Sequence, residues 1–367
     1  MVFFDKAFGQ ILHNLTELVE VLKRMCLAFS VSFLVAALSA PVVIKYLKKL
    51  KLEQVLRDPK EVRDLAKLHS PKEHTPTMGG MIIVAATLVG TAIAVHWNRQ
   101  VIIALCSYLL CATMGFIDDF AKIRAKNTKG IPGRIKLLIQ LLISVGIIGA
   151  LYHVPNLWEP YTTMPIPFTG RNFTISSPVL LAIFLFFVLA GTSNSVNLTD
   201  GLDGLATGCA IPVLLFLATV AILSSNAYTA PFISRVAISG NGELAVICAA
   251  TMGALVVFLW YNSYPAAIFM GDMGSLSLGA LIGIIAFLTN HSLHLVVAGG
   301  IFVIEALSDI LQVFSYKFCN KRRIFRMAPI HHHFELSGYH ETKITMRFWL
   351  ISGFFSLAGC MGLHAFF

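Results

Sequence analysis

Residues 100–120 read QVIIALCSYLLCATMGFIDDF, an apolar run that ends in the adjacent carboxylates Asp118 and Asp119. A run of this length is typical of an α-helix that crosses the hydrocarbon core of a bilayer. An ionised side chain in hydrocarbon costs at least a few kcal/mol, so acids at such a border are usually held there by something that they bind. Two carboxylates offer hard oxygen ligands, which suit Mg²⁺, although a helix end that faces water has the same pattern.

The whole chain has the composition of a membrane protein. Of its 367 residues, 56% are hydrophobic and 13% are charged, which is too apolar for a water-soluble domain of this size. We therefore predict one all-α polytopic domain over residues 1–367. About ten transmembrane helices are expected, at 25–46, 78–97, 100–117, 135–152, 177–193, 205–224, 243–261, 275–290, 293–316 and 344–366.

Basic residues orient the predicted helices. Most Lys and Arg residues lie in the first, third and ninth loops, so the positive-inside rule makes the odd-numbered loops cytoplasmic and places both termini outside. The net charge of +9 is then explained by these loops and by anionic lipid head groups, and no nucleic-acid partner is expected. Residues 1–24 are amphipathic and are expected to lie along the membrane interface. The outer segment 153–177 predicts a small periplasmic β-hairpin.

Polar clusters recur in the odd-numbered loops. In the first loop, Lys72 and the TPTMGG stretch at 75–80 could hold an anion, although an ordinary helix start explains them equally well. The fifth loop reads NLTDGLDG at 197–204, and if it is helical Asp200 and Asp203 project from one face. That loop is too short for an EF-hand and lacks its terminal Glu. A ligand site is therefore the favoured interpretation of the fifth loop.

The seventh and ninth loops add a further acid and a histidine triplet. Asp272, in FMGDMGS at 269–275, is flanked by glycines at the head of a span, which suits a metal ligand or a helix cap. Consecutive histidines in PIHHHFE at 329–335 cannot all point one way, so phosphate binding fits better than zinc. Glu305 and Asp309 share one helical face within the ninth span and are left without a role.

Together the five loops predict a cytoplasmic active-site cleft for Mg²⁺-dependent phosphoryl transfer. Metal and basic side chains neutralise phosphate charge in such a centre, and an acid activates the attacking oxygen. Because the cleft lies at the bilayer surface, one lipid substrate and one soluble substrate are expected. A transporter would instead place polar or broken-helix positions near the bilayer midplane, whereas the predicted spans are nearly continuous.

Five stretches of the chain, taken together and in order, resemble the phospho-N-acetylmuramoyl-pentapeptide transferase family. They are TPTMGG, GFIDDF, NLTDGLDGLA, FMGDMGSLSLG and PIHHHFEL. The Asp-Asp and NxxDGxDG elements also resemble the wider polyprenyl-phosphate N-acetylhexosamine-1-phosphate transferases, so a related GlcNAc-1-phosphate transferase is the alternative. The resemblance implies a ten-helix homodimer in the bacterial inner membrane. It would use Mg²⁺ to transfer phospho-MurNAc-pentapeptide from UDP-MurNAc-pentapeptide to undecaprenyl phosphate, giving lipid I and UMP.

The same resemblance implies residue roles. Asp272 is similar to the family's Mg²⁺ ligand, with Asp118 and Asp119 as the acids that activate or position the lipid phosphate and as further candidate ligands. The essential histidine motif corresponds to His331, His332 and His333. Residues expected at the uridine diphosphate end are Lys72, Thr77, Asn197, Asp200, Asp203, Asn262 and Phe269, with Phe269 placed to stack on uracil. We favour direct attack with Asp118 as base over a covalent phosphoryl-enzyme.

Overall fold

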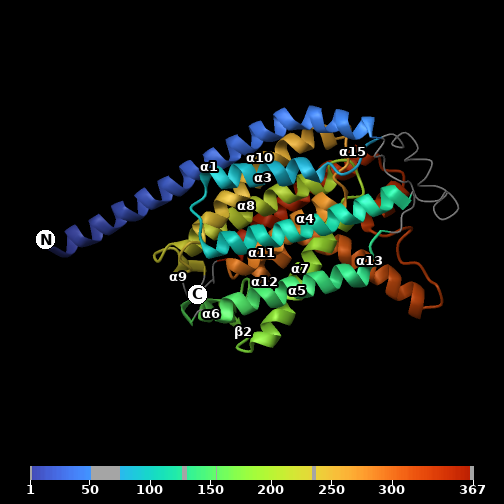
Figure 1. The fold of residues 1–367 in the computed structure, drawn as a ribbon. Helices are drawn as coiled ribbons and strands as arrows, with labels where there is room; N and C mark the ends of the chain where they lie inside the picture. The colour runs from blue at the N-terminus through green and yellow to red at the C-terminus, as the bar shows by residue number, and fades with distance from the viewer. Residues whose placement is uncertain (1, 51–74, 126–129, 154, 234–236, 364–367) are drawn as a thin grey trace.

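The computed structural model describes residues 2–50, 75–125, 130–153, 155–233 and 237–363. These residues form a bundle of long helices that run roughly alongside one another (Figure 1). In lipid, only a structure that satisfies its own backbone hydrogen bonds can cross the hydrocarbon core, and helices do so within each segment. The all-α polytopic fold is confirmed.

Ten apolar helical segments match the ten predicted spans. Eight helices in the described part of the chain are long and apolar enough to cross a membrane: α1 (Val2–Lys49), α4 (Arg99–Ala125), α5 (Gly133–Tyr152), α7 (Pro178–Thr199), α8 (Leu205–Ser225), α10 (Gly242–Asn262), α11 (Gly271–Leu288) and α15 (Glu341–Met361). The ninth is the shorter apolar helix α3 (Gly80–Ala94), and the tenth is the bent pair α12 (Ser292–Ala298) and α13 (Gly300–Phe318).

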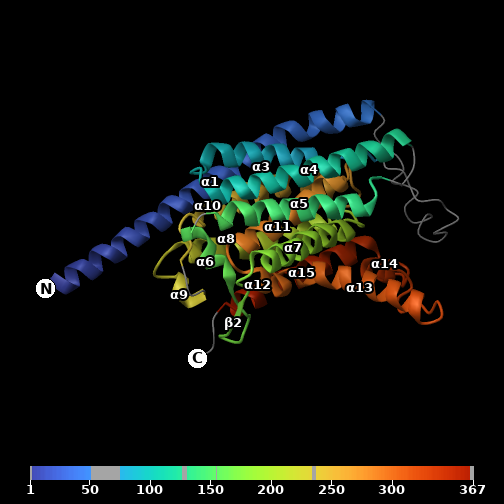
Figure 2. The ribbon, with the colours of Figure 1, turned by 60° about the horizontal axis from the view of Figure 1, so that its bottom comes forward.

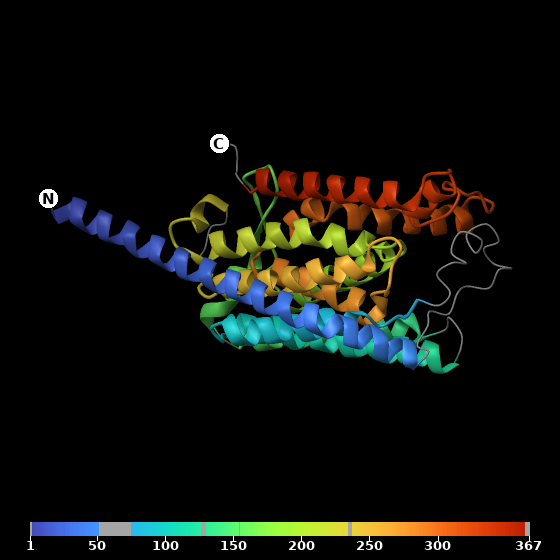
Figure 3. The same ribbon diagram turned by 90° about the horizontal axis from the view of Figure 1, so that it is seen from above.

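Two of these segments differ from expectation. Residues 2–24 belong to the same helix as the first predicted span, because α1 continues unbroken through them and extends beyond the bundle (Figures 1 and 3), and their position along the membrane interface stays a prediction. The prediction of a continuous span over 293–316 is wrong, because α12 and α13 meet at an angle of 83°. The bend falls at Gly299 and Gly300, and glycine is among the weakest helix formers.

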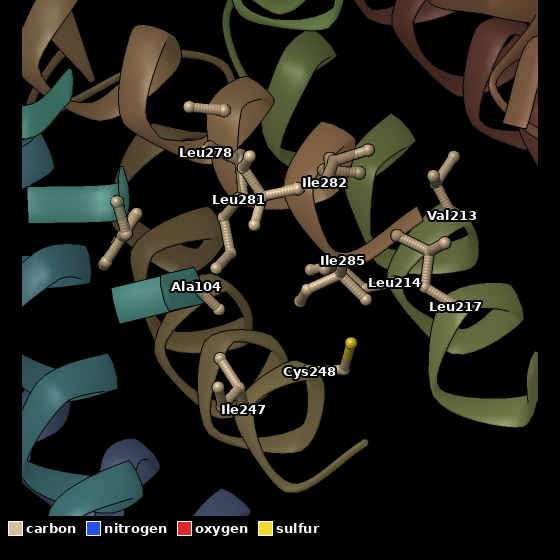
Figure 4. Packing of buried hydrophobic residues seen from close by; sticks show 14 of the residues in the cluster. Ala104, Val213, Leu214, Leu217, Ile247, Cys248, Leu278, Leu281, Ile282 and Ile285 are labelled. Atoms are coloured by element: carbon tan, nitrogen blue, oxygen red, sulfur yellow. The ribbon is translucent and has the colours of Figure 1, made fainter. Parts of the chain in front are cut away.

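Helix α11 lies at the centre of the bundle. In the most apolar stretch of α11, 83% is buried inside the protein, whereas the corresponding share in the peripheral helix α1 is 28%. A helix that is apolar on all sides is stable only when neighbours or lipid surround it. Figure 4 shows α11 side chains packed among those of α4, α8 and α10, including Leu278, Leu281, Ile282, Ile285, Ala104, Leu214, Leu217 and Ile247. Because neighbouring helices pack around α11, the residues at its first turn have a defined position.

The predicted hairpin is confirmed in a shorter form. Strands β1 (Thr163–Pro165) and β2 (Asn172–Thr174) pair antiparallel, with Met164 opposite Phe173. They follow the short helix α6 (Pro155–Thr162) and lie at the same end of the bundle as α9 (Ala230–Ile233) (Figure 2). The opposite end of the bundle carries the last turns of α1 and α4 and the first turn of α5 (Figure 1). The helix ends that border the first and third loops therefore lie at one end of the bundle, in agreement with the charge pattern.

Candidate active site

Three carboxylates meet where α4 approaches the first turn of α11. Asp118 and Asp119 come from the last turns of α4, and Asp272 is the second residue of α11. The approach depends on Gly115, since a Cβ atom there would lie 2.3 Å from the carbonyl oxygen of Asp272. Each acid offers one oxygen, and these three oxygens lie within 4.8 Å of one another. Acids separated by about 150 residues in the sequence thus form one cluster.

The side chain of Asp119 caps the N-terminus of α11. Its carboxylate accepts hydrogen bonds from the backbone N–H groups of Asp272, at 3.1 Å, and Met273, at 3.0 Å. The first N–H groups of a helix have no partner within the helix, and the helix dipole favours negative charge at that position. Only 4% of the Asp119 surface is exposed. Asp119 therefore joins α4 to α11 as well as contributing an oxygen to the cluster.

Two lysines enter the carboxylate cluster. Lys122 Nζ lies 2.6 Å from Asp118 Oδ2 and 3.1 Å from Asp272 Oδ2. Lys136 Nζ lies 3.1 Å and 2.7 Å from the same two oxygens. Lys122 is on α4 one turn after Asp118, whereas Lys136 is on the first turn of α5. Sequence reasoning counted both lysines only as loop charge, although the spacing of four from Asp118 to Lys122 was a usable signal.

This oxygen set fits a divalent cation. Mg²⁺ prefers oxygen ligands and is usually held by one or two carboxylates together with phosphate and water, and three carboxylates are available at Asp118, Asp119 and Asp272. The ammonium groups of Lys122 and Lys136 lie among these carboxylates, so the net charge of the five side chains is small. Asp118 is additionally fixed by the backbone N–H of Ile131, which donates to its Oδ1 at 2.6 Å. The cluster is therefore equipped to receive metal and phosphate together.

The end of α7 supplies an amide and a fourth acid. Asn197 Nδ2 donates to Asp272 Oδ1 at 3.0 Å and to Ser275 Oγ at 2.8 Å, so it orients the acid on α11. Asp200 follows at the C-cap of α7 and is half-buried. Burial, with the negative charges of Asp272 and Asp119, raises the pKa of the Asp200 carboxyl well above its usual range. Asp200 is thus more easily protonated than an ordinary aspartate.

The three histidines point to three different partners, as expected for consecutive residues. On the short helix α14 (Ile330–Glu335), His331 Nδ1 lies 2.9 Å from Glu305 Oε2, and His332 Nδ1 lies 2.7 Å from Glu335 Oε2. His333 Nδ1 accepts the backbone N–H of Arg326 at 3.1 Å. Glu305, left without a role from the sequence, is therefore the partner of His331.

His331 also reaches the fifth loop. A Cβ atom on Gly201 would lie 2.3 Å from His331 Nε2, so only glycine admits the imidazole at this point. His331 is fully buried, and its Nε2 has no hydrogen-bond partner among the described residues. A buried polar atom without a partner costs about 1–3 kcal/mol. His331 Nε2 is accordingly a bonding position that the described residues leave unfilled, directly beside Gly201.

Comparison with known proteins agrees with this arrangement. The family model for glycosyl transferase family 4 matches residues 101–290. Phospho-N-acetylmuramoyl-pentapeptide-transferase of Thermodesulfovibrio yellowstonii is 44% identical over 96% of this chain and 98% of its own length. The enzymes of the same name from Methylacidiphilum infernorum and Rickettsia prowazekii are 44% and 38% identical, over 88% and 93% of this chain and 88% and 92% of their own lengths. The chain belongs to the phospho-N-acetylmuramoyl-pentapeptide-transferase family.

Some residues expected at the nucleotide end in this transferase family make internal contacts. Asp203 is buried, and its Oδ2 accepts the backbone N–H of Ala266 at 3.0 Å. Asn262 accepts from Thr207 Oγ1 at 2.9 Å and donates to the carbonyl of Ile268 at 3.0 Å. These bonds join the fifth loop and α8 to the seventh loop. A nucleotide role for Asp203 and Asn262 stays a prediction.

Phe269 and Thr77, which were also expected at the nucleotide end, lie along the contact between the first and seventh loops. Phe269 is half-buried, and its backbone pairs with that of the first loop: its N–H donates to the carbonyl of Pro76 at 2.9 Å, and its carbonyl accepts from Gly79 at 2.8 Å. Thr77 lies within this paired stretch and is buried. Lys72 lies outside the described residues. The structure thus connects the TPTMGG and FMGDMG motifs of the transferase family through their backbones.

Proposed function

We propose that this protein transfers phospho-MurNAc-pentapeptide from UDP-MurNAc-pentapeptide to undecaprenyl phosphate, with lipid I and UMP as products. The observation that carries the proposal is the cluster of Asp118, Asp119, Asp272, Lys122 and Lys136 at one end of a helical membrane bundle. Such a cluster neutralises phosphate charge beside the bilayer, where a lipid phosphate and a soluble nucleotide can both reach it. Membership of the transferase family supports the choice of substrates.

Each side chain of the cluster has a proposed task. Lys122 and Lys136 bind the phosphate oxygens, and Asn197 keeps the Asp272 carboxylate oriented. Asp118 accepts the proton of the lipid phosphate as that oxygen attacks the β-phosphorus of the UDP substrate, and UMP leaves. We propose Mg²⁺ as the cofactor, held by Asp272 with Asp118 and Asp119. When bound, this ion would neutralise the diphosphate charge.

The test is an assay of UMP release by purified protein in detergent, with both substrates and Mg²⁺, with and without EDTA. EDTA is expected to stop the reaction, and UDP-GlcNAc is expected to be a poor replacement for UDP-MurNAc-pentapeptide. Asp272→Asn should abolish Mg²⁺-dependent release and leave membrane insertion intact. Glu159→Gln, which removes an exposed acid on α6, is the matched control and should keep full activity. Wild-type turnover of Asp272→Asn would refute the metal assignment.

Direct attack by the lipid phosphate has its own test. Incubation with the UDP substrate alone should release no UMP and trap no phosphoryl-enzyme, because only a covalent scheme proceeds before the lipid arrives. Release of one equivalent of UMP without lipid would replace direct attack by the covalent scheme. This result would leave the overall transfer reaction in place.

We further propose that the active site faces the cytoplasm across the bacterial inner membrane and that the protein forms a homodimer. The proposed side is supported by the basic loops that leave the bundle at the end where the carboxylate cluster lies. Cys319, exposed at the end of α13, offers a probe at that end. In a variant that retains only Cys319, an impermeant thiol reagent should label inside-out vesicles and not intact spheroplasts. Native mass spectrometry in detergent should show two chains per particle.

A further inference from the structure

Two basic side chains near the start of α15 share one aromatic ring. Lys343 Nζ lies 5.8 Å from the centroid of the Tyr339 ring, and Arg347 Cζ lies 5.5 Å from it. All three side chains are exposed. Like charges four residues apart on a helix repel each other, and contact with one ring offsets this only in part. The pair therefore concentrates positive charge at one point of the surface.

Among the described residues, no acidic group forms an ion pair with Lys343 or Arg347. The nearest acid in sequence is Glu341, which is buried and accepts the backbone N–H of Asp203 at 2.6 Å. Its carboxylate is thus engaged with the fifth loop. Within the part of the chain that the structure describes, the two cations are therefore free to attract a negative charge from a ligand.

The surface below the two cations is suited to lipid chains. Met346, Leu350, Phe354 and Leu357 follow along the same face of α15 and are 60%, 67%, 72% and 64% exposed. Figure 3 shows α15, in red, along one edge of the bundle, so this face is turned away from the other helices. Large apolar side chains with such exposure on a membrane span contact acyl chains. A charged head-group region and an acyl-chain region therefore adjoin on one helix.

The opposite face of α15 packs inward. Trp349 Nε1 donates to the carbonyl of Gly204 at 3.1 Å, and Ser352 Oγ donates to the carbonyl of Cys209 at 2.8 Å, both on or beside α8. The surface formed by Tyr339, Lys343 and Arg347 is thus separated from the carboxylate cluster by the body of α15. A ligand there would not occupy the proposed catalytic site.

We propose that Tyr339, Lys343 and Arg347 bind the head group of an anionic glycerophospholipid, with its acyl chains along Met346 and Leu350. The guanidinium of Arg347 matches two phosphate oxygens, Lys343 adds a second positive charge, and the Tyr339 hydroxyl can donate to the head group. Basic residues at the membrane end of a span attract anionic lipids electrostatically. This site requires only that the chain spans a membrane and does not depend on the proposed transferase activity.

The test is lipid binding by native mass spectrometry of the purified full-length protein. Wild type is compared with Lys343→Gln/Arg347→Gln, titrated with phosphatidylglycerol and with phosphatidylcholine of the same acyl chains. Lys48→Gln/Lys49→Gln is the matched control, because it removes the same charge from the exposed last turn of α1. Wild type should bind phosphatidylglycerol more tightly than phosphatidylcholine. The Lys343/Arg347 variant should lose about 30-fold in that affinity, and the control should lose little.

Several results would overturn the site. These are an unchanged affinity in the Lys343/Arg347 variant, an equal loss in the Lys48/Lys49 control, or equal binding of phosphatidylcholine by wild type. Competition by inorganic phosphate as effective as that by phosphatidylglycerol would indicate an anion site that does not recognise lipid. Stronger binding of undecaprenyl phosphate to the same residues would assign the site to the acceptor lipid instead. The thermal unfolding midpoint of each variant is measured alongside, and a wild-type midpoint ties any loss of binding to the removed charges.

Discussion

Replacing Gly115 by alanine tests whether the approach of α4 to α11 builds the active site. The added Cβ would lie 2.3 Å from the carbonyl oxygen of Asp272 and 2.5 Å from its carbonyl carbon, and ordinary contact begins at 3.4 Å. Both contacts are backbone atoms, so no side-chain rotation relieves them. The two helices must separate by about 1 Å, and a shift of this size in a catalytic group can cost about 100-fold in rate.

The assay is UMP release by Gly115→Ala in detergent with saturating substrates. We expect kcat to fall about 100-fold with a smaller change in the KM for the UDP substrate, because Asp118 and Asp119 move away from Asp272. Gly146→Ala on α5 is the control, since nothing lies within 4 Å of a Cβ atom there. It should keep wild-type turnover. A folded Gly115→Ala protein with wild-type kcat would refute the view that this backbone contact sets the geometry of the acids.

Four further substitutions, at three positions, probe other contacts. Lys136→Gln should lower kcat about 100-fold or more, measured by the same assay, because phosphate loses one of two cations. Glu305→Leu should lower activity and thermal stability together by leaving His331 Nδ1 without its partner, whereas Glu305→Gln should restore most of the stability in a melting experiment. Glu243→Gln, at the opposite end of the bundle, should lower the melting temperature by a few degrees, because the half-buried Arg24 loses its partner. Its kcat should be unchanged. A loss of kcat at normal stability would contradict this prediction.

Chemistry-bearing residues could be recognised from the sequence because their types and neighbours are unusual for membrane-border loops. Carboxylates at the end of an apolar span, as at Asp118, and a glycine-flanked acid, as at Asp272, are costly unless they bind something. The sequence predicted that these acids converge only because the positive-inside rule places all odd-numbered loops on one side of the membrane. The structure brings the acids into one cluster. The place of Lys136 in the active site could not be predicted from the sequence. A lysine in a basic loop has the same pattern whether it binds phosphate or only orients the protein in the membrane.

By itself the sequence determined that the protein is helical, that ten apolar segments are present, and which loops hold the polar residues. Hydrocarbon imposes these properties on each segment separately, through length, hydropathy and the sign of the flanking charge. Only the tertiary structure decided which side chains touch. The close approach at Gly115, the pairing of His331 with Glu305 and the bend before α13 depend on how whole helices pack, and packing is set by backbone contacts between segments distant in the sequence.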